Sequence, residues 1–531
     1  MLITALIFAA ALAVSLGSYL MLSTNSLNLS HRTFLANSAV NLAETGLEES
    51  VWMFNTMGNS SNWTANSALW QSKGWATNTT IGDVYMRSMG SGYSTAPSVN
   101  ISGGGGTGAV GVATIGTVYL TETTTATRVT GIKLTNSGTG YTSAPTVSLS
   151  GGGGTGAVAE ARLSATRTLT FNNLEGGATG TVKVWVAGYN GTAVVPVIVA
   201  KASVKPASGQ PVEKVVKVIL SKNGALPKGV VAFNGITWNG HPLADSYLST
   251  VSTSNPPLPP FSFYNENTAR ANTTVASLGG TINLGAQGDV NGNVMLGAGV
   301  TVTGGHISGL TIGNFTFPFT MPTAPTASYY NLGATVPPVL PRVTDVAIGG
   351  VYYYSVSGAS PGTPAIIGAT TVTAGAKIVI KGTNTQMASG LILSVNNATS
   401  AVATADIYID GPVILAGNDK INGVASPNPN WAGSLQVFTT TANACSFSGN
   451  AKFYGCLTAP NSALVGNGGG SDGVDLCGSF IVKTVTSNGH MNFHYDEALG
   501  SLNPGRAWGL ALWKEMQSLS DRAVYAEYLN F

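Results

Sequence analysis

The amino-acid sequence predicts an α+β protein that is mostly β. We expect a long N-terminal helix, a β-sheet with inserted glycine-rich β repeats, a C-terminal parallel β-helix-like domain and a short terminal helix. Three observations support this fold class. They are an apolar N-terminal stretch that continues into an amphipathic periodicity, two nearly identical glycine-rich units, and many short Val/Thr/Ile runs separated by Gly/Asn turns.

The composition narrows the class of protein. Only 9% of the 531 residues are charged, against roughly 25% in an average soluble domain, and 68 are glycine. The formal net charge of +2 gives no basic patch of the kind that binds nucleic acid, so we expect no nucleic-acid partner. We divide the chain into an N-terminal helix (1–57), a β domain (58–235) with two inserted repeats (about 87–165), a linker (236–264), a β-helix-like domain (265–505) and a C-terminal helical segment (506–531).

The N-terminal region predicts one long helix with two different halves. Residues 1–30 contain no charged side chain, and residues 1–22 are apolar enough to cross a bilayer. From Arg32 onward, apolar residues recur at three- and four-residue steps, which is typical of a helix with one buried face. The residues of that face are Leu35, Ala39, Leu42, Ala43, Leu47, Val51 and Phe54.

These stretches resemble type IV pilins, and PilX-type pilin-like proteins in particular. LITALIFAAAL is similar to the start of that family after its leader is removed, and NLAETGLEESVW is similar to its AAExAL stretch. One position departs from the family, because type IV pilins usually carry a Glu at position five that pairs with a neighbour's N-terminal amine, and this chain has Ala5. The resemblance implies a filament core formed by the apolar half of the helix, through Leu2, Ile3, Leu6, Ile7, Phe8, Leu12, Val14, Leu20 and Leu22.

A 21-residue unit occurs twice in the β domain. Gly90–Val110 and Gly138–Val158 are offset by 48 positions and share 15 identical residues, including GGGGTGAV. The glycine run lacks the GK[ST] ending of a phosphate-binding loop, so we interpret each unit as short strands joined by glycine turns. We expect the repeats to be inserted into a sheet built from Val- and Thr-rich runs at 81–86, 166–171, 180–187, 194–204 and 212–220.

The second half of the chain predicts stacked β coils. A proline-rich stretch at 254–263 marks a boundary, after which residues 278–315 alternate three- to five-residue strands with Gly/Asn turns. Further on, SGNAKFYGC, FYGCLTAP and NFHYDEAL resemble a β-helix module often found after PilX-type N-termini. This second resemblance covers roughly residues 265–500 and implies a parallel β-helix there.

Candidate chemical sites are few, and we expect no catalytic residue. No paired carboxylates on a recognisable coil and no nucleophile elbow stand out. His490 and His494 have a spacing that could ligate a metal, but they border a family signature that we interpret as closing the last coil. Asp472 and Asp475 in a glycine-rich turn are a weak alternative for a Ca²⁺ site. Otherwise we expect no metal and no cofactor.

The cysteines and the C-terminus give two more predictions. A disulfide between Cys445 and Cys456, which flank one turn-rich segment, competes with a Cys456–Cys477 pairing and with three buried free thiols. The C-terminal segment has apolar residues at helical spacing, which predicts a terminal helix that caps the end of the β-helix. Those residues are Trp508, Leu512, Trp513, Met516 and Leu519.

Together the two resemblances imply a structural subunit of an extracellular type IV pilus-like filament, with surface-exposed β domains. A minor or tip pilin acting as an adhesin is the alternative, and a β-helix polysaccharide-active enzyme is a remote one. The implied partners are copies of itself or other pilins, the inner membrane before assembly, and surface glycans or host or neighbouring cell surfaces. The implied location is a cell-surface filament, with the N-terminal helix as a membrane anchor before assembly.

Overall fold

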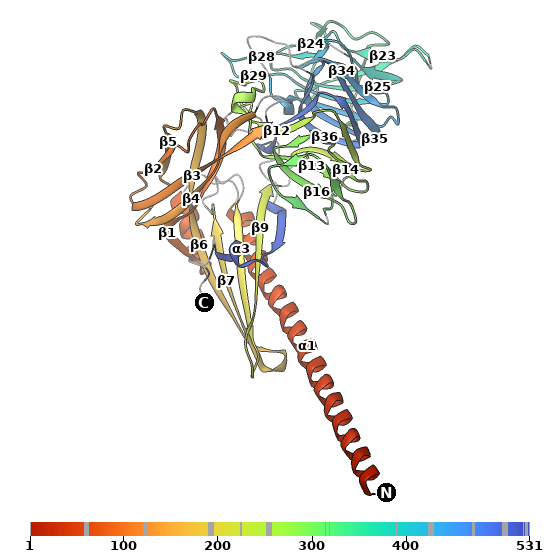
Figure 1. Ribbon diagram of the computed structural model, residues 1–531. Helices are drawn as coiled ribbons and strands as arrows, with labels where there is room; N and C mark the ends of the chain where they lie inside the picture. Colours follow the sequence, from red (N-terminus) through yellow and green to blue (C-terminus); the bar gives the residue numbers. More distant parts are fainter. Residues whose placement is uncertain are drawn as a thin grey trace.

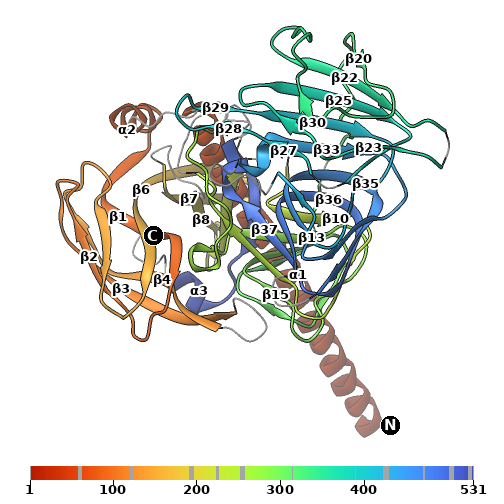
Figure 2. The same ribbon diagram turned by 90° about the horizontal axis from the view of Figure 1, so that it is seen from above.

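The computed structural model consists of two β lobes and a long helix that projects away from them (Figure 1). Seen from above, the lobes lie side by side, with the repeat-containing sheet on one side and the stacked coils on the other (Figure 2). The predicted fold class, α+β and mostly β, is confirmed. The structure describes residues 2–57, 63–119, 125–189, 196–222, 226–250, 257–313, 315–317, 319–360, 362–388, 390–422, 430–469, 473–501, 508–523, 525 and 529.

Helix α1 (Leu2–Met57) is continuous, and its C-terminal half packs on the first lobe. It lies across β7 (Ala178–Ala187), β8 (Val197–Lys205) and β9 (Val212–Lys222). Gly46 permits a close approach, because a Cβ atom there would lie 2.6 Å from Cγ2 of Val184. The predicted apolar face is confirmed, since Leu35, Ala39, Leu42, Ala43, Leu47 and Phe54 are buried and Val51 is partly buried.

The sheet of the first lobe is antiparallel, with strand order β2-β5-β6-β7-β8-β9-β38 and with β1 paired to β6. The runs predicted as strands fall in β1, β6, β7, β8 and β9, although residues 194–195 lie outside the described part of the chain. The other elements of this lobe are β1 (Ala76–Ser91), β2 (Ser98–Ser102), β3 (Thr107–Tyr119), β4 (Thr125–Thr139), β5 (Thr146–Ser150), β6 (Thr155–Leu174), the short helix α2 (Trp63–Ser72) and the 3₁₀ turn η1 (Glu175–Gly177).

The two repeats occupy equivalent places in this lobe. Each contributes a short strand (β2 or β5), a glycine turn and the start of a long strand (β3 or β6). The short strands pair antiparallel about their own centres, where Asn100 lies opposite Ser148, its equivalent 48 residues on. The long β1 and β6 continue from the sheet that packs on α1 into the repeat region, so the repeats extend that sheet.

The C-terminal segment differs from the prediction. Strand β38 (Trp508–Glu515) pairs antiparallel with β9, and only α3 (Leu519–Ala523) is helical, so the helix expected over Trp508–Leu519 is wrong for most of its length. The open edge of β9 offers unpaired backbone groups, and pairing with them outweighs the helical spacing of the side chains. Strand β38 therefore adds to the edge of the first lobe's sheet.

The second lobe is a stack of parallel coils whose apolar side chains fill its interior. On one face the strands follow each other in the order β20-β22-β25-β30-β33-β35-β36-β10-β13-β16-β19. A second ladder runs through β11, β14 and β17, and a third through β37, β12, β15 and β18. The three ladders make this a three-sided, parallel β-helix-like domain.

The strands of this lobe are mostly short. In chain order they are β10 (Gly229–Ala232), β11 (Ile236–Asn239), β12 (Leu243–Tyr247), β13 (Thr273–Ser277), β14 (Ile282–Asn283), β15 (Asp289–Val290), β16 (Gly292–Leu296), β17 (Val302–Thr303), β18 (His306–Ile307), β19 (Thr311–Ile312), β20 (Tyr330–Asn331), β21 (Val339–Leu340), β22 (Tyr352–Ser357), β23 (Ala365–Ile367), β24 (Thr371–Val372), β25 (Lys377–Thr383), β26 (Thr385–Met387), β27 (Ile392–Leu393), β28 (Val395–Asn396), β29 (Ala401–Val402), β30 (Thr404–Ile409), β31 (Ile414–Leu415), β32 (Lys420–Ile421), β33 (Leu435–Thr439), β34 (Cys445–Gly449), β35 (Lys452–Gly468), β36 (Val474–Gly489) and β37 (Met491–Asp496). Short 3₁₀ turns lie at η2 (Glu266–Thr268), η3 (Ala432–Ser434) and η4 (Glu497–Ser501).

The chain enters this stack in its middle. Strands β10 to β19 build one end, and the chain then returns to the other end at β20 and comes back to β36, which pairs with β10. The segment expected to be a linker, 236–264, therefore contains β11 and β12, and the stack begins at Gly229 instead of residue 265. Residues 257–263 of the proline-rich stretch lie between β12 and β13, so they connect the first coil to the second and do not precede the domain, whereas residues 254–256 lie outside the described part.

Arg128 ties the two lobes together. It lies on β4 with only 1% of its surface exposed, and its guanidinium donates to the carbonyl oxygens of Ala269 (2.9 Å) and Glu266 (2.8 Å). Both acceptors belong to the η2 turn or the residue after it, in the second lobe. A charged group is costly to bury without partners, so this contact fixes the repeat region against the coils.

Candidate functional site

The N-terminal half of α1 is an apolar surface that nothing in the structure covers. Of the residues predicted to form an assembly core, Ile3, Leu6, Ile7, Phe8, Leu12, Val14, Leu20 and Leu22 are between 58% and 73% exposed, whereas the side chain of Leu2 lies outside the described part. The helix is long and apolar enough to cross a membrane. Figure 1 shows this half of α1 extending away from both lobes.

Two serine hydroxyls in the apolar part of this half are satisfied within the helix. Ser15 donates to the carbonyl oxygen of Ala11 (2.8 Å), and Ser18 donates to that of Val14 (2.9 Å). Such back-bonding to the preceding turn lets a hydroxyl group enter an apolar environment without losing its hydrogen bond. These two serines are therefore compatible with an environment of lipid or of other apolar helices.

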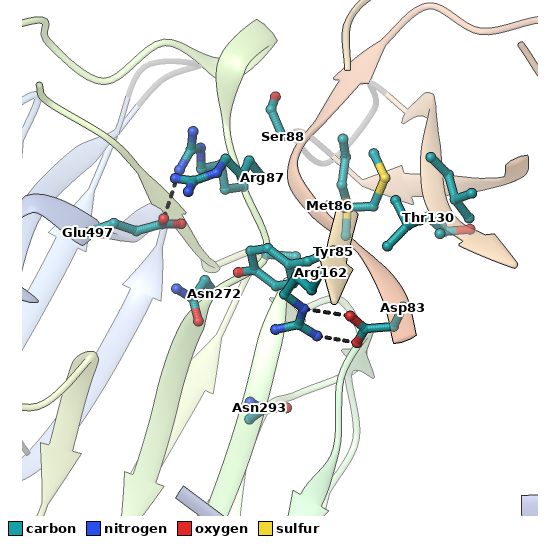
Figure 3. A pocket seen from close by; sticks show the side chains of 16 residues that line it. Asp83, Tyr85, Met86, Arg87, Ser88, Thr130, Arg162, Asn272, Asn293 and Glu497 are labelled. Atoms are coloured by element: carbon teal, nitrogen blue, oxygen red, sulfur yellow. Dashed lines mark hydrogen bonds and ion pairs between the residues drawn. The ribbon is translucent and has the colours of Figure 1, made fainter. Parts of the chain in front are cut away.

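A cavity of about 410 Å³ lies where the two lobes meet (Figure 3). Its lining comes from β1, β4 and β6 in the first lobe, and from the segment 270–272, β16 and Glu497 in the second lobe. These segments are far apart in the chain and meet only in the folded protein. Arg128, whose two hydrogen bonds join the lobes, also lies on β4. The same strand therefore lines the cavity and holds its two walls at a fixed distance.

The charges of this cavity cancel in pairs. Each guanidinium that lines it faces a carboxylate, and the Arg162 pair is bidentate, with Nε to Oδ1 of Asp83 at 2.6 Å. The Glu497 carboxylate is used at both oxygens, since Ser246 donates to Oε1 at 2.9 Å and Arg270 to Oε2 at 2.8 Å. The three pairs are Asp83 with Arg162, Glu160 with Arg87, and Glu497 with Arg270.

Three uncharged polar groups in the cavity keep hydrogen-bonding capacity. Within the described residues, the Tyr85 hydroxyl and the Asn272 carboxamide have no hydrogen-bond partner, and Asn293 uses only its Oδ1, which accepts from the Leu310 amide at 2.9 Å. Burial, with a contribution from the Glu497 carboxylate, raises the pKa of Tyr85 to about 12, so its hydroxyl remains a donor. Figure 3 shows Tyr85 directed into the cavity on the side of Asn272.

The residues considered for metal binding have structural contacts instead. His494 is buried, with Nδ1 2.6 Å from Oδ1 of Asp245 and Nε2 3.5 Å from Oδ1 of Asp475. Asp475 also faces Lys452 at 2.9 Å, and Asp472 lies outside the described residues. Among the described residues, no group of three His, Cys, Asp or Glu side chains is placed to hold a metal ion.

Three further polar residues, in and next to β37 in the middle of the stack, have similar contacts. Asp496 accepts from the backbone amides of Ser249 (3.2 Å) and Ala498 (3.1 Å). The His490 ring stacks on His241, with centroids 6.1 Å apart. The role of Glu497 as a wall of the cavity had no signal in the sequence, because its partner Arg270 lies 227 positions away.

The three cysteines are free and buried, so the possible Cys445–Cys456 disulfide is a wrong prediction. Cys445 belongs to the apolar interior of the stack, whereas Cys456 packs with Trp431 and Tyr495 in a separate cluster. The two side chains thus serve different clusters, which a shared turn-rich segment in the sequence does not reveal.

Comparisons with known proteins find a matching family and a similar solved structure. Residues 348–502 match a family described as a domain of unknown function (DUF7305). No curated protein matches. The chain is similar to the crystal structure of the competence-associated pilin ComZ from Thermus thermophilus, with 11% identity and a TM-score of 0.23 over 66% of this chain and 87% of that one.

Proposed function

We propose that this chain is a structural subunit of an extracellular type IV pilus-like filament, assembled through the N-terminal half of α1. The observation that carries the proposal is the contrast within one helix. Its C-terminal half is buried against β7, β8 and β9, and its N-terminal half is apolar, uncharged and exposed. Leaving apolar surface in water costs roughly 25 cal/mol per Å², so a surface of this extent requires a partner.

The partner changes during assembly. Before assembly, the exposed half of α1 spans the inner membrane, as its length and hydropathy allow. In the filament, the same surface packs against α1 helices of other copies or of other pilins. Because both lobes lie at the opposite end of α1, they face outward on the cell-surface filament (Figure 1).

A charge placed on each half of α1 tests this mechanism. Leu12→Lys puts an ammonium group on the exposed apolar half, where burial in lipid or among helices costs roughly 3 kcal/mol. Thr45→Lys is the matched control, because Thr45 is exposed on the half already packed on the lobe. We expect Leu12→Lys, like deletion of residues 1–30, to remove the chain from sheared filaments while Thr45→Lys leaves it there. Normal amounts of the Leu12→Lys chain in filaments would contradict the proposal.

A minor or tip pilin acting as an adhesin is the second candidate function. It is favoured by Ala5, which replaces the Glu that in type IV pilins pairs with a neighbour's N-terminal amine. A large outward-facing second lobe suits contact with surface glycans or with host or neighbouring cells. Immunogold labelling of filaments separates the two functions, since a bulk subunit labels along the whole length and a tip subunit labels one end.

We also infer that the chain is not an enzyme. The cavity's two carboxylates, Asp83 and Glu497, are held in ion pairs and therefore do not act as a free acid and base. Turnover of a polysaccharide by the purified chain that Glu497→Gln abolishes would contradict this inference.

A further inference from the structure

We infer that the cavity between the two lobes binds a neutral saccharide. Its volume of about 410 Å³ falls within the roughly 300–1,000 Å³ typical of small-molecule sites. Its walls come from both lobes, which Arg128 holds in place through two carbonyl contacts. The site is therefore formed before any ligand arrives, which reduces the entropic cost of binding.

The paired charges select against an anionic ligand. Every guanidinium at the cavity already faces a carboxylate. A phosphate or carboxylate ligand would have to replace Asp83 at Arg162 or Glu497 at Arg270, and the loss of these charged hydrogen bonds would oppose its binding. The same pairing removes any net charge that would attract a cation.

The groups that keep hydrogen-bonding capacity match the hydroxyls of a sugar. The Tyr85 hydroxyl and the Asn272 carboxamide can each donate and accept, and Asn293 offers its NH₂ group. A sugar hydroxyl is likewise donor and acceptor, so one ring can satisfy several of them at once. Met86 and Ile132 add an apolar wall on which the C–H face of a sugar ring can lie.

The site does not depend on filament assembly. The cavity is built entirely from the two lobes, and only its outward presentation to other cells rests on the proposed function (Figures 1 and 2). A chain that binds saccharide but does not enter filaments would refute the proposed function and leave this inference intact.

Calorimetric titration of the full chain in detergent micelles tests the inference. The probes are di- to tetrasaccharides of glucose, galactose, mannose and N-acetylglucosamine, with sialylated and phosphorylated sugars and short peptides for comparison. We expect at least one neutral saccharide to bind. Tyr85→Phe keeps the ring and removes only the hydroxyl, so it should weaken binding about 2- to 10-fold, and Asn272→Ala should have an effect of the same size.

Matched variants outside the cavity control for general effects. Tyr329→Phe removes a hydroxyl that donates to the Pro325 carbonyl oxygen in the second lobe, and Asn100→Ala truncates an exposed amide on β2. Both should bind saccharide as the unaltered chain does. If Asn272→Ala fails to fold, Tyr85→Phe still decides, because that hydroxyl has no partner among the described residues. The inference would be overturned if no neutral saccharide bound, if only anionic sugars or peptides bound, or if both cavity variants bound saccharide as tightly as the unaltered chain.

Discussion

The backbone amide of Ser94 donates a 2.8 Å hydrogen bond to the carbonyl oxygen of Gly152, in the glycine turn of the other repeat. The equivalent residues 48 positions away make the same bond in reverse, since Thr142 donates to Gly104 at 2.8 Å. Each repeat thus holds the other's glycine turn. The similarity of the two units is explained by this local two-fold arrangement, because two similar units can close on each other with identical contacts.

The reciprocal contacts of the two glycine turns predict how much alanine costs in stability at each of four glycines. Gly104 and Gly152 have positive φ, and a Cβ atom at either would lie 2.6 or 2.5 Å from a carbonyl oxygen of the other repeat. Gly103 and Gly151 also have positive φ, but a Cβ there meets nothing within 4 Å. Alanine at Gly103 or Gly151 should therefore cost only the backbone strain, roughly 1–2 kcal/mol. Alanine at Gly104 or Gly152 should cost clearly more.

Thermal unfolding of the four single variants, followed by circular dichroism, checks this pattern. The unfolding temperatures of Gly104→Ala and Gly152→Ala should be similar to each other and low. Those of Gly103→Ala and Gly151→Ala should be similar to each other and higher. If Gly104→Ala were no more destabilising than Gly103→Ala, the reciprocal packing would be wrong.

Loss of the Arg128 hydrogen bonds should let the two lobes unfold separately. Arg128→Met keeps much of the side-chain volume but removes both hydrogen bonds to the η2 region, so the carbonyl oxygen of Ala269 loses its Arg128 donor and that of Glu266 keeps only the Ala269 amide. We expect a loss of roughly 2–4 kcal/mol and a calorimetric transition that splits in two. Lys133→Met, an exposed site on the same strand, is the control and should melt as a single transition.

The buried His494 predicts a decrease in stability at alkaline pH. The carboxylates of Asp245 and Asp475 outweigh burial and raise the pKa of His494 to about 9 from 6.5. A raised pKa in the folded state means that the stabilisation is complete below about pH 6.5 and is lost as the pH rises through 9. His494→Gln should lower the free energy of unfolding by roughly 2–4 kcal/mol at pH 6 and remove most of its slope between pH 7 and 9. An unchanged slope would contradict the assignment.

Substitution of Asp406 should raise the stability of the chain, whereas substitution of His494 should lower it. Burial raises the pKa of this carboxyl to about 6 from 3.8, so its ionisation in the folded state is unfavourable. The group should therefore make stability fall as the pH rises from about 4 to 6. Asp406→Asn should stabilise the chain by roughly 1–2 kcal/mol at pH 7 and flatten that slope, as measured by chemical unfolding. Asp410→Asn is a useful comparison, because Asp410 accepts from the backbone amides of Asn384 and Thr385 and its loss should destabilise.

Local periodicity predicted much of the fold. The three- and four-residue steps from Leu35 to Phe54 identified the buried face of α1, because a helix with one packed side requires that spacing. Alternation in Val- and Thr-rich runs identified the strands of the first lobe for the same reason. The absence of charge before Arg32 identified the half of the helix that the structure leaves exposed.

Long-range pairing was not predictable from the sequence. The pairing of Val230 with Phe480 joins strands 250 positions apart, and nothing local marks β10 as the middle of a stack. The spacing of the side chains in β38 predicts a helix, because apolar residues at three- and four-residue steps also occur by chance in a strand of mostly apolar residues. The cavity was missed for the same physical reason, since Tyr85, Asn272 and Glu497 come together only through the lobe interface.

The central claim is that the uncharged half of α1 becomes the core of a filament, and a cryo-electron microscopy reconstruction of filaments from cells that produce this chain tests it most directly. We expect residues 1–30 to lie at the filament axis, packed against apolar helices, with both lobes on the outside. A filament whose core excludes these residues, or one in which the lobes form the axis, would contradict it.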